Sequence, residues 1–263
     1  MKTLSLEYHD VYTGTNPDAS GFPGAGPASY KLPRDKFVHH LAAISETRAN
    51  VVRIVDSITS DRPEMSLCIT FDDGGCGAMD AADALETHGW RGHFFVTAGK
   101  IGEPAFLSRT QLGELQRRGH IIGTHSMTHP KMMGALAESV VFDEWRQSRG
   151  LLEDAISAPV ITASVPGGFF KPHVGRAAAT AGVQILFTSS PTVRSTRIDG
   201  CWILGRYTIR RGTSATTAAA IAARKLLPRA SQSILYGTLT AIRSVTGSRY
   251  TRVRDAIWAR LGS

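Results

Sequence analysis

Two short segments of the chain carry the residue types of a divalent-metal site. The segment at 70–74 (TFDDG) places Asp72 and Asp73 directly after an apolar run, and the segment at 123–130 (GTHSMTHP) places His125 and His129 four residues apart. One carboxylate and two imidazoles are a donor set for a catalytic divalent ion that keeps positions open for water and substrate. The second carboxylate is then free to act as a base toward the attacking water.

Each motif also has an ordinary structural interpretation. An Asp-Asp-Gly run by itself usually opens a turn, and nine histidines in the chain make an accidental pair at this spacing easy. The two motifs together, one of them behind a buried strand, favour the metal site. Ser126 and Thr128 lie among the histidines and are candidates to orient their rings.

The segments around these motifs alternate between predicted strands and predicted helices. We expect strands at 4–8, 65–71, 93–97, 120–125, 160–164, 183–188 and 202–209, and helices at 79–88, 135–155 and 173–181. This alternation predicts a parallel α/β sheet. The candidate residues follow the strands, as they do in β/α barrels, whose active face is formed by the strand ends and the loops after them. Residues 13–34, rich in Gly, Pro, Ser and Ala, indicate a long loop.

The aspartate and histidine motifs resemble the first two signature motifs of the polysaccharide deacetylases, the NodB-homology enzymes of carbohydrate esterase family 4. The resemblance covers about residues 1–210 and implies a distorted (β/α)7-type barrel. It implies that Asp72 is the general base. It also implies that Asp73, His125 and His129 hold Zn²⁺, with Co²⁺ or Ni²⁺ as alternatives.

A third segment, at 164–170 (SVPGGFF), resembles the family motif Arg-x-Pro-Tyr/Phe-Gly, but Ser164 stands where the arginine is expected. In the family that arginine orients the base aspartate, and Arg206 and Arg210 are the candidates to replace it. The backbone N–H of Gly167 is predicted to contribute to an oxyanion hole. A glycine-rich turn without a catalytic role is the alternative.

The general acid is predicted at the start of the chain. The late Leu-x-His motif of the family has no counterpart after residue 183, but residues 6–10 (LEYHD) resemble the Tyr-His strand end with which a permuted subset of the family begins. His9 is therefore the predicted acid that protonates the departing amine, with His173 as the fallback. Cys76 has no partner that would make it a ligand or nucleophile and is expected to pack.

The net charge of +8 is concentrated at the C-terminus. Residues 214–263 hold eight Lys or Arg and one acid, whereas residues 1–213 hold 22 basic and 21 acidic residues. We therefore divide the chain into a catalytic barrel, 1–213, and a basic helical extension, 214–263, whose helices are separated by Pro228 and Gly247. We expect these helices to pack on the barrel, and peripheral membrane association through their surface arginines is a hypothesis; a solvated helical appendage is the alternative. No nucleic-acid-binding motif is present, so we expect no nucleic-acid partner.

Composition and the start of the chain bear on location and class. The first residues lack the apolar core of a signal peptide, no stretch approaches the ~18–20 apolar residues of a membrane span, and the three cysteines form no metal spacing. We expect a cytoplasmic enzyme that removes acetyl groups from N-acetylated sugars of a bacterial polysaccharide or its precursor. The alternatives are a small-amide hydrolase on the same barrel and a non-catalytic carbohydrate-binding or scaffold protein, which Ser164 keeps open. The sequence leaves the oligomeric state open.

Overall fold

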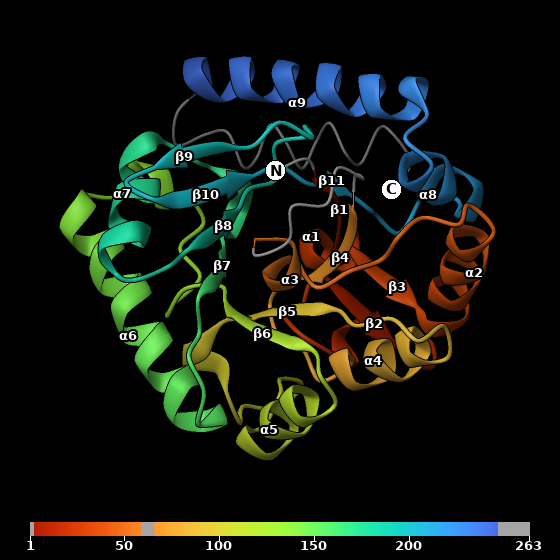
Figure 1. The fold of residues 1–263 in the computed structure, drawn as a ribbon, viewed down its shortest axis with the longest axis horizontal. Helices are drawn as coiled ribbons and strands as arrows, with labels where there is room; N and C mark the ends of the chain where they lie inside the picture. The colour runs from red at the N-terminus through yellow and green to blue at the C-terminus, as the bar shows by residue number, and fades with distance from the viewer. Residues whose placement is uncertain (1–2, 59–65, 247–263) are drawn as a thin grey trace.

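A curled sheet of nine strands forms the centre of the molecule (Figure 1), in the order β11-β1-β4-β5-β6-β7-β8-β10-β9. The computed structural model describes residues 3–58 and 66–246. Neighbouring strands in this sheet are parallel except β10 and β9, which are antiparallel. Helices surround the sheet, which closes incompletely. The predicted α/β class and distorted barrel are therefore confirmed.

The elements have the following bounds. The nine strands are β1 (Thr3–Tyr8), β4 (Ser66–Phe71), β5 (His93–Val96), β6 (Ile121–Thr124), β7 (Thr162–Ser164), β8 (Ile185–Phe187), β9 (Thr196–Ile198), β10 (Cys201–Leu204) and β11 (Tyr207–Thr208). A separate parallel pair is formed by β2 (Asp10–Tyr12) and β3 (Lys31–Pro33). The α-helices are α1 (Ala25–Ala28), α2 (Arg34–Ser45), α3 (Ile54–Ile58), α4 (Ala78–Glu86), α5 (Arg109–Arg117), α6 (Glu138–Ile156), α7 (Pro172–Thr180), α8 (Ala215–Ala222) and α9 (Leu226–Thr246).

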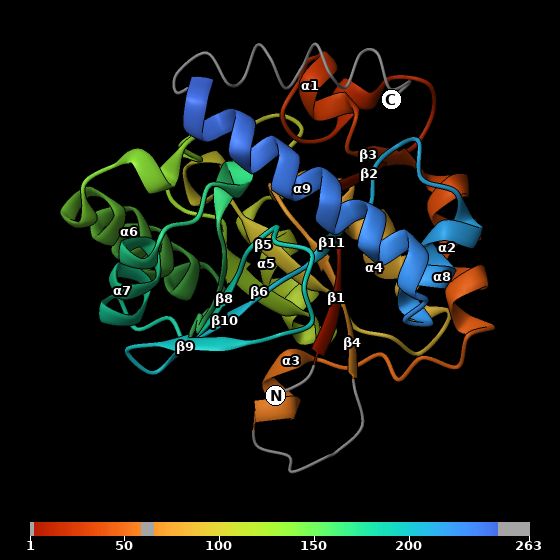
Figure 2. The ribbon, with the colours of Figure 1, turned by 90° about the horizontal axis from the view of Figure 1, so that it is seen from above.

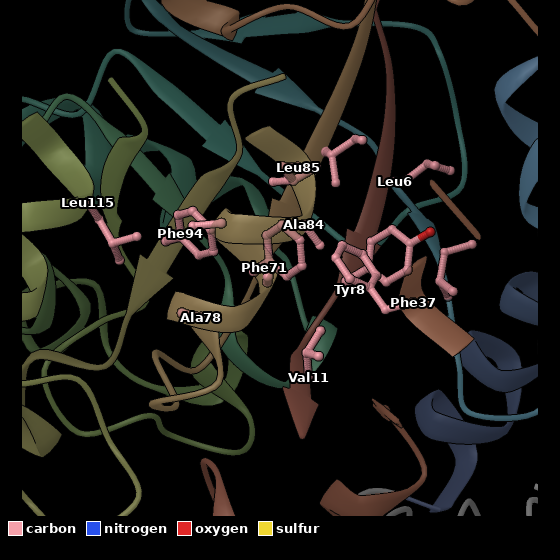
Figure 3. Close-up of a cluster of buried hydrophobic side chains, with 14 of the residues drawn as sticks. Leu6, Tyr8, Val11, Phe37, Phe71, Ala78, Ala84, Leu85, Phe94 and Leu115 are labelled. Atoms are coloured by element: carbon pink, nitrogen blue, oxygen red, sulfur yellow. The ribbon is translucent and has the colours of Figure 1, made fainter. Parts of the chain in front are cut away.

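The main hydrophobic core lies between the first strands and helices α2, α4 and α5 (Figure 3). The Phe71 ring stacks on Phe94, with centroids 4.8 Å apart, and on Tyr8, with centroids 5.6 Å apart. Tyr8 and Phe71 are the last residues of β1 and β4, and both are almost fully buried. Because His9 and Asp72 follow them directly, this packing fixes the strand ends that carry two of the candidate residues.

The segment expected to be one strand, 202–209, is instead two strands in different places. β10 pairs with β8, whereas β11 pairs with β1 at the opposite end of the strand order. Gly205 and Arg206 join them, and a Cβ on Gly205 would lie 2.3 Å from the carbonyl oxygen of Ser190. The chain here crosses between the two ends of the curled sheet, which a local apolar pattern does not reveal.

The C-terminal helices pack on the outside of the fold, and α9 covers the gap between the two ends of the curled sheet. Helix α8 packs against α2 and buries Ile221. Helix α9 lies across the outside of the gap in both views (Figures 1 and 2), where Gln232 Nε2 donates to the carbonyl of Thr208 at 3.0 Å and Ser190 Oγ donates to Tyr236 Oη at 3.0 Å. These bonds tie α9 to β11 and to the loop after β8.

Two expectations about the C-terminal region meet the structure differently. The predicted helix break at Pro228 is wrong, because α9 begins at Leu226 and proline in a first helical turn costs no hydrogen bond. The third predicted helix, 250–261, lies outside the described residues, and the boundary at 213 stays a prediction. Among the described helices, none combines the length and the apolar character needed to cross a membrane.

Candidate active site

The predicted metal ligands meet at the C-terminal edge of the sheet. Asp73 follows β4, and His125 follows β6, two strands along in the sheet. Asp73 Oδ1 lies 3.6 Å from His125 Nε2 and 3.4 Å from His129 Nε2. All three donor atoms lie within 4.8 Å of one another, so one cation could contact them together. One carboxylate oxygen and two imidazole nitrogens fit the donor set of Zn²⁺ and similar ions.

The surroundings of His125 leave its second nitrogen available as a ligand. Its Nδ1 donates to the backbone carbonyl of Ser164 at 3.0 Å, which leaves the lone pair on Nε2 beside Asp73. Burial lowers the pKa of His125 to about 4. The imidazole is therefore neutral at pH 7, which is the form that binds a metal.

Asp73 and His129 are paired, and each shifts the pKa of the other. Burial by itself would raise the pKa of Asp73, but the hydrogen bond from His129 and the nearby imidazoles outweigh it and lower this pKa to about 2. Burial would lower the pKa of His129, and the bond to Asp73 outweighs that effect and raises it. A bound cation would take the place of the proton shared by this pair.

The loop that carries both histidines is held by residues around it. Glu144 on α6 accepts hydrogen bonds from the backbone N–H groups of Met127 and Thr128, both at 2.9 Å, and from Thr128 Oγ1 at 2.6 Å. Ser126 Oγ accepts from the N–H of His129 at 3.1 Å. Ser126 and Thr128 thus fix the backbone of the loop, whereas their predicted contact was with the rings. No sequence motif pointed to Glu144.

Three non-glycine residues of this site have left-handed backbone conformations: Asp73 (φ +76°), Ser126 (φ +68°) and His129 (φ +58°). Such conformations cost free energy and persist where the surrounding structure enforces them. At Asp73 the turn directs consecutive carboxylates to different partners. The Asp73 side chain meets the histidines, and the Asp72 side chain meets Arg206.

Arg206, not Arg210, is the arginine that holds Asp72. Its Nη1 donates to Asp72 Oδ1 at 2.7 Å and its Nη2 to Asp72 Oδ2 at 2.8 Å, a bidentate pair with both side chains almost fully buried. Ser164 Oγ accepts from Arg206 Nη2 at 2.7 Å and donates to Asp72 Oδ2 at 3.1 Å. Ser164, which stands at the arginine position of the family motif, therefore contacts both Arg206 and Asp72.

A second carboxylate, unanticipated from the sequence, shares the same arginine. Arg206 Nη2 donates to Glu7 Oε1 at 2.9 Å, and Ser189 and Thr208 donate to the Glu7 oxygens at 2.8 and 2.5 Å. Burial raises the pKa of Asp72, but the adjacent Arg206 charge outweighs it and holds that pKa well below its usual range. Asp72 is therefore ionised at pH 7. The only signal for Glu7 in the sequence is a charge within a predicted strand.

The remaining predicted residues lie around this centre or apart from it. One ring nitrogen of His9 lies within 4.8 Å of carboxylate oxygens of Glu7 and Asp72. Gly167 (φ +65°) follows β7, and a Cβ there would lie 2.3 Å from the carbonyl oxygen of Lys131. The fallback residue, His173, lies on α7 and belongs to neither group of candidate ligands found among the described residues, and the same holds for Cys76.

The loop at 13–34 forms a wall of this site, which the sequence did not indicate. Phe22 contacts His129, with ring centroids 4.8 Å apart, and Tyr30 contacts His9, with centroids 4.5 Å apart. Ser20 ties the loop to β2 and to the start of α4, because its Oγ donates to Asp10 Oδ2 at 2.6 Å and accepts from the N–H of Gly77 at 2.7 Å.

Comparison with solved structures identifies the class of fold. BC0361, a polysaccharide deacetylase from Bacillus cereus, matches with a TM-score of 0.68 and 18% identity over 84% of this chain and 69% of that one. The Streptococcus pyogenes deacetylase PplD matches with a TM-score of 0.68 and 18% identity over 82% and 95%. IcaB from Ammonifex degensii matches with a TM-score of 0.64 and 18% identity over 83% and 96%. The chain therefore has the fold of these deacetylases.

Sequence comparison finds similarity to the same class of proteins. Residues 59–186 match the family model described as polysaccharide deacetylase. YxkH of Bacillus subtilis (strain 168), whose name places it among the polysaccharide deacetylases, is 24% identical over 215 residues, 80% of this chain and 72% of the relative. Over residues 59–186 the chain is therefore similar to the polysaccharide deacetylase family. Its place in a permuted subset stays a prediction.

Replacing Arg206 should strongly destabilise the protein. In Arg206→Met the carboxylates of Glu7 and Asp72 stay buried without their cation, so we expect a loss of about 3–5 kcal/mol in the free energy of unfolding at pH 7, measured with urea. Adding Glu7→Gln should recover part of this loss, because one of the two uncompensated charges is removed. A loss under about 1 kcal/mol in the single variant would contradict the assigned role.

Asp10 should make stability depend on pH between about 4 and 7. Burial raises the pKa of Asp10 to about 7, although the hydrogen bonds from Ser20 and Val11 oppose it. As pH rises from about 4, Asp10 ionises in the unfolded chain before it ionises in the folded one, so its contribution to stability is lost toward pH 7. Asp10→Asn should remove this contribution. Relative to wild type, the free energy of unfolding of the variant should therefore rise by up to about 4 kcal/mol between pH 4 and pH 7. If urea unfolding gives the same difference in free energy of unfolding between the two proteins at every pH, the result would contradict this.

Proposed function

We propose that this protein is a metal-dependent hydrolase that removes acetyl groups from N-acetylated sugars of a bacterial polysaccharide or its precursor. The observation that carries the proposal is the placement of Asp73, His125 and His129 around one point, beside an Asp72 that Arg206 keeps ionised. The match of residues 59–186 to the polysaccharide deacetylase family model supports deacetylation of a carbohydrate. The polymer, and the choice of N-acetyl over O-acetyl groups, are part of the proposal.

Each residue has a distinct role in this proposal. Asp73, His125 and His129 hold Zn²⁺ or a similar ion, which when bound would polarise the acetamide carbonyl and acidify the attacking water. Asp72 accepts the proton of that water. The N–H of Gly167 donates to the developing oxyanion. His9 gives a proton to the nitrogen as the C–N bond breaks, so acetate and a free amino sugar leave.

The contact between Arg206 and Asp72 also bears on the alternatives. Ser164 lacks the charge that orients the base aspartate in the family, and for this reason a non-catalytic scaffold is one of the alternatives. Arg206 supplies that charge from another part of the chain and so supports the catalytic alternative. A substrate panel that includes small linear and cyclic amides distinguishes the sugar deacetylase from a small-amide hydrolase.

Asp72→Asn should abolish turnover without loss of the metal. We expect Zn²⁺ or Co²⁺ to restore acetate release by metal-stripped wild type from an N-acetylated oligosaccharide, and kcat of Asp72→Asn to be lower by about 10²–10⁴. Metal content per chain, measured by elemental analysis, should be unchanged in Asp72→Asn and reduced in the matched control Asp73→Asn. Near wild-type turnover by Asp72→Asn would show that the base is wrongly assigned. No acetate release with either metal, despite tight binding, would favour the non-catalytic role.

The C-terminal extension is proposed to hold the enzyme at an anionic membrane surface. Leu226, Leu227 and Ile234 of α9 are 75%, 83% and 71% exposed, and the exposed side chains of Arg224 and Lys225 lie next to them in the chain. Apolar side chains beside cations are typical of helices that lie on anionic lipid. The cytoplasmic location stays a prediction alongside this one.

Vesicle binding tests this surface. Wild type should sediment with vesicles of phosphatidylcholine and phosphatidylglycerol, less so at high salt, and should stay in solution with phosphatidylcholine alone. Leu226→Ser/Leu227→Ser/Ile234→Ser should bind the anionic vesicles at least tenfold more weakly, with unchanged thermal unfolding because these side chains are exposed. Equal sedimentation of the triple variant would contradict a role for α9.

A further inference from the structure

His9, the general acid of the proposed function, has no hydrogen bond at its buried ring nitrogen. Among the described residues Nδ1 of His9 finds no partner, whereas Nδ1 of His125 donates to the carbonyl of Ser164. A proton donor must hold a fixed orientation toward the atom that it protonates. On the side of Nδ1, the orientation of the His9 ring is therefore left to a packing contact rather than to a hydrogen bond.

Tyr30 makes that contact. Its ring centroid lies 4.5 Å from that of His9, with 32° between the ring planes. Strand pairing brings the two residues together, because β2 and β3 are parallel with Asp10 opposite Lys31, and His9 and Tyr30 directly precede those residues. The contact is therefore built into the register of the small sheet.

Tyr30 is itself held in place by Arg210. The Arg210 guanidinium lies 4.3 Å from the centre of the Tyr30 ring, and its Nη2 donates to Tyr30 Oη at 2.9 Å. The two contacts combine a cation–π interaction with a charge-assisted hydrogen bond. Arg210, the arginine that does not reach Asp72, thus supports the residue beside His9.

The backbone that carries Tyr30 is also fixed. The almost fully buried Lys31 donates from Nζ to the carbonyl oxygens of Pro17 at 3.0 Å and Phe22 at 2.6 Å. The N–H of Arg211 donates to the carbonyl of Ser29 at 2.9 Å. These bonds hold the loop at both sides of Tyr30, so its ring is in position before any substrate arrives.

We propose that Tyr30 is a positioning residue that fixes the His9 imidazole for protonation of the leaving amine. This inference rests on the role of His9 in the proposed function. Removing the ring should slow the cleavage of an amide, whose nitrogen must be protonated to leave. It should spare an activated ester such as 4-nitrophenyl acetate, whose phenolate leaves without a proton.

Steady-state kinetics of the zinc-loaded full chain test the proposal. With N-acetylglucosamine oligosaccharides, Tyr30→Ala should lower kcat at least tenfold and change KM less than threefold, while the rate with 4-nitrophenyl acetate stays within twofold. Tyr30→Phe keeps the ring and should retain most of the amide activity. Equal losses on both substrates, or no loss on the amide, would overturn the proposal.

A double-mutant cycle separates positioning of His9 from a direct contact of Tyr30 with substrate. If Tyr30 acts through His9, adding Tyr30→Ala to His9→Ala should lower kcat no further. Phe22→Ala is the matched control, because Phe22 contacts His129 from the same loop and its effect should add to that of His9→Ala. A further tenfold loss on adding Tyr30→Ala to His9→Ala would overturn the proposal.

The His9→Ala variant also shows which inference has failed. If its amide turnover equals that of wild type, the acid is wrongly assigned, which is a failure of the proposed function. The contact itself is then tested by NMR of the imidazole protons, with His9→Ala used to assign them. Tyr30→Ala should shift the His9 resonances and Phe22→Ala should not. Unchanged His9 resonances in Tyr30→Ala would overturn the positioning role.

Discussion

The buried guanidinium of Arg206 is the interaction on which the rest of the site depends. It is fully buried and bonds to Glu7 of β1, to Thr70 and Asp72 at the end of β4, and to Ser164 of β7. A charge removed from water is tolerated only when close partners replace its hydration. The strands that supply these partners must therefore stay in register, and the chain crosses between the two ends of the curled sheet at this arginine.

The same interaction separates the chemistry of two adjacent carboxylates. Arg206 keeps Asp72 ionised and fixes both of its oxygens, whereas the left-handed backbone of Asp73 directs the next carboxylate to His125 and His129. Of two identical side chains at consecutive positions, Asp72 thus meets a guanidinium and Asp73 meets two imidazoles. In the proposed function, the different environments of these two identical side chains make Asp72 the base and Asp73 the metal ligand.

The other side of the site is built from a loop that looks flexible by composition. Residues 13–34 contain many small residues, but the buried Lys31 of this segment bonds to the carbonyls of Pro17 and Phe22, and buried Asp10 of β2 accepts from Ser20. Burying such groups is unfavourable unless they are hydrogen-bonded, so their bonds hold the loop in a defined shape. As a result, Phe22 contacts His129, a proposed metal ligand, and Tyr30 contacts His9, the proposed general acid.

The sequence by itself determined the alternation of strands and helices, the two motifs proposed to hold the metal and the resemblance to the polysaccharide deacetylases, because each is a local pattern of residue types at fixed spacing. For the arginine that the family motif has at the position of Ser164, the sequence offered Arg206 and Arg210 as replacements but could not choose between them. Only the tertiary structure brought Arg206 to Glu7, 199 residues away in the chain, and placed Glu144 and Tyr30 beside the histidines. The curl of the sheet and the pairing of β2 with β3 decide these contacts, and partners so distant in the chain leave no periodic signal in it.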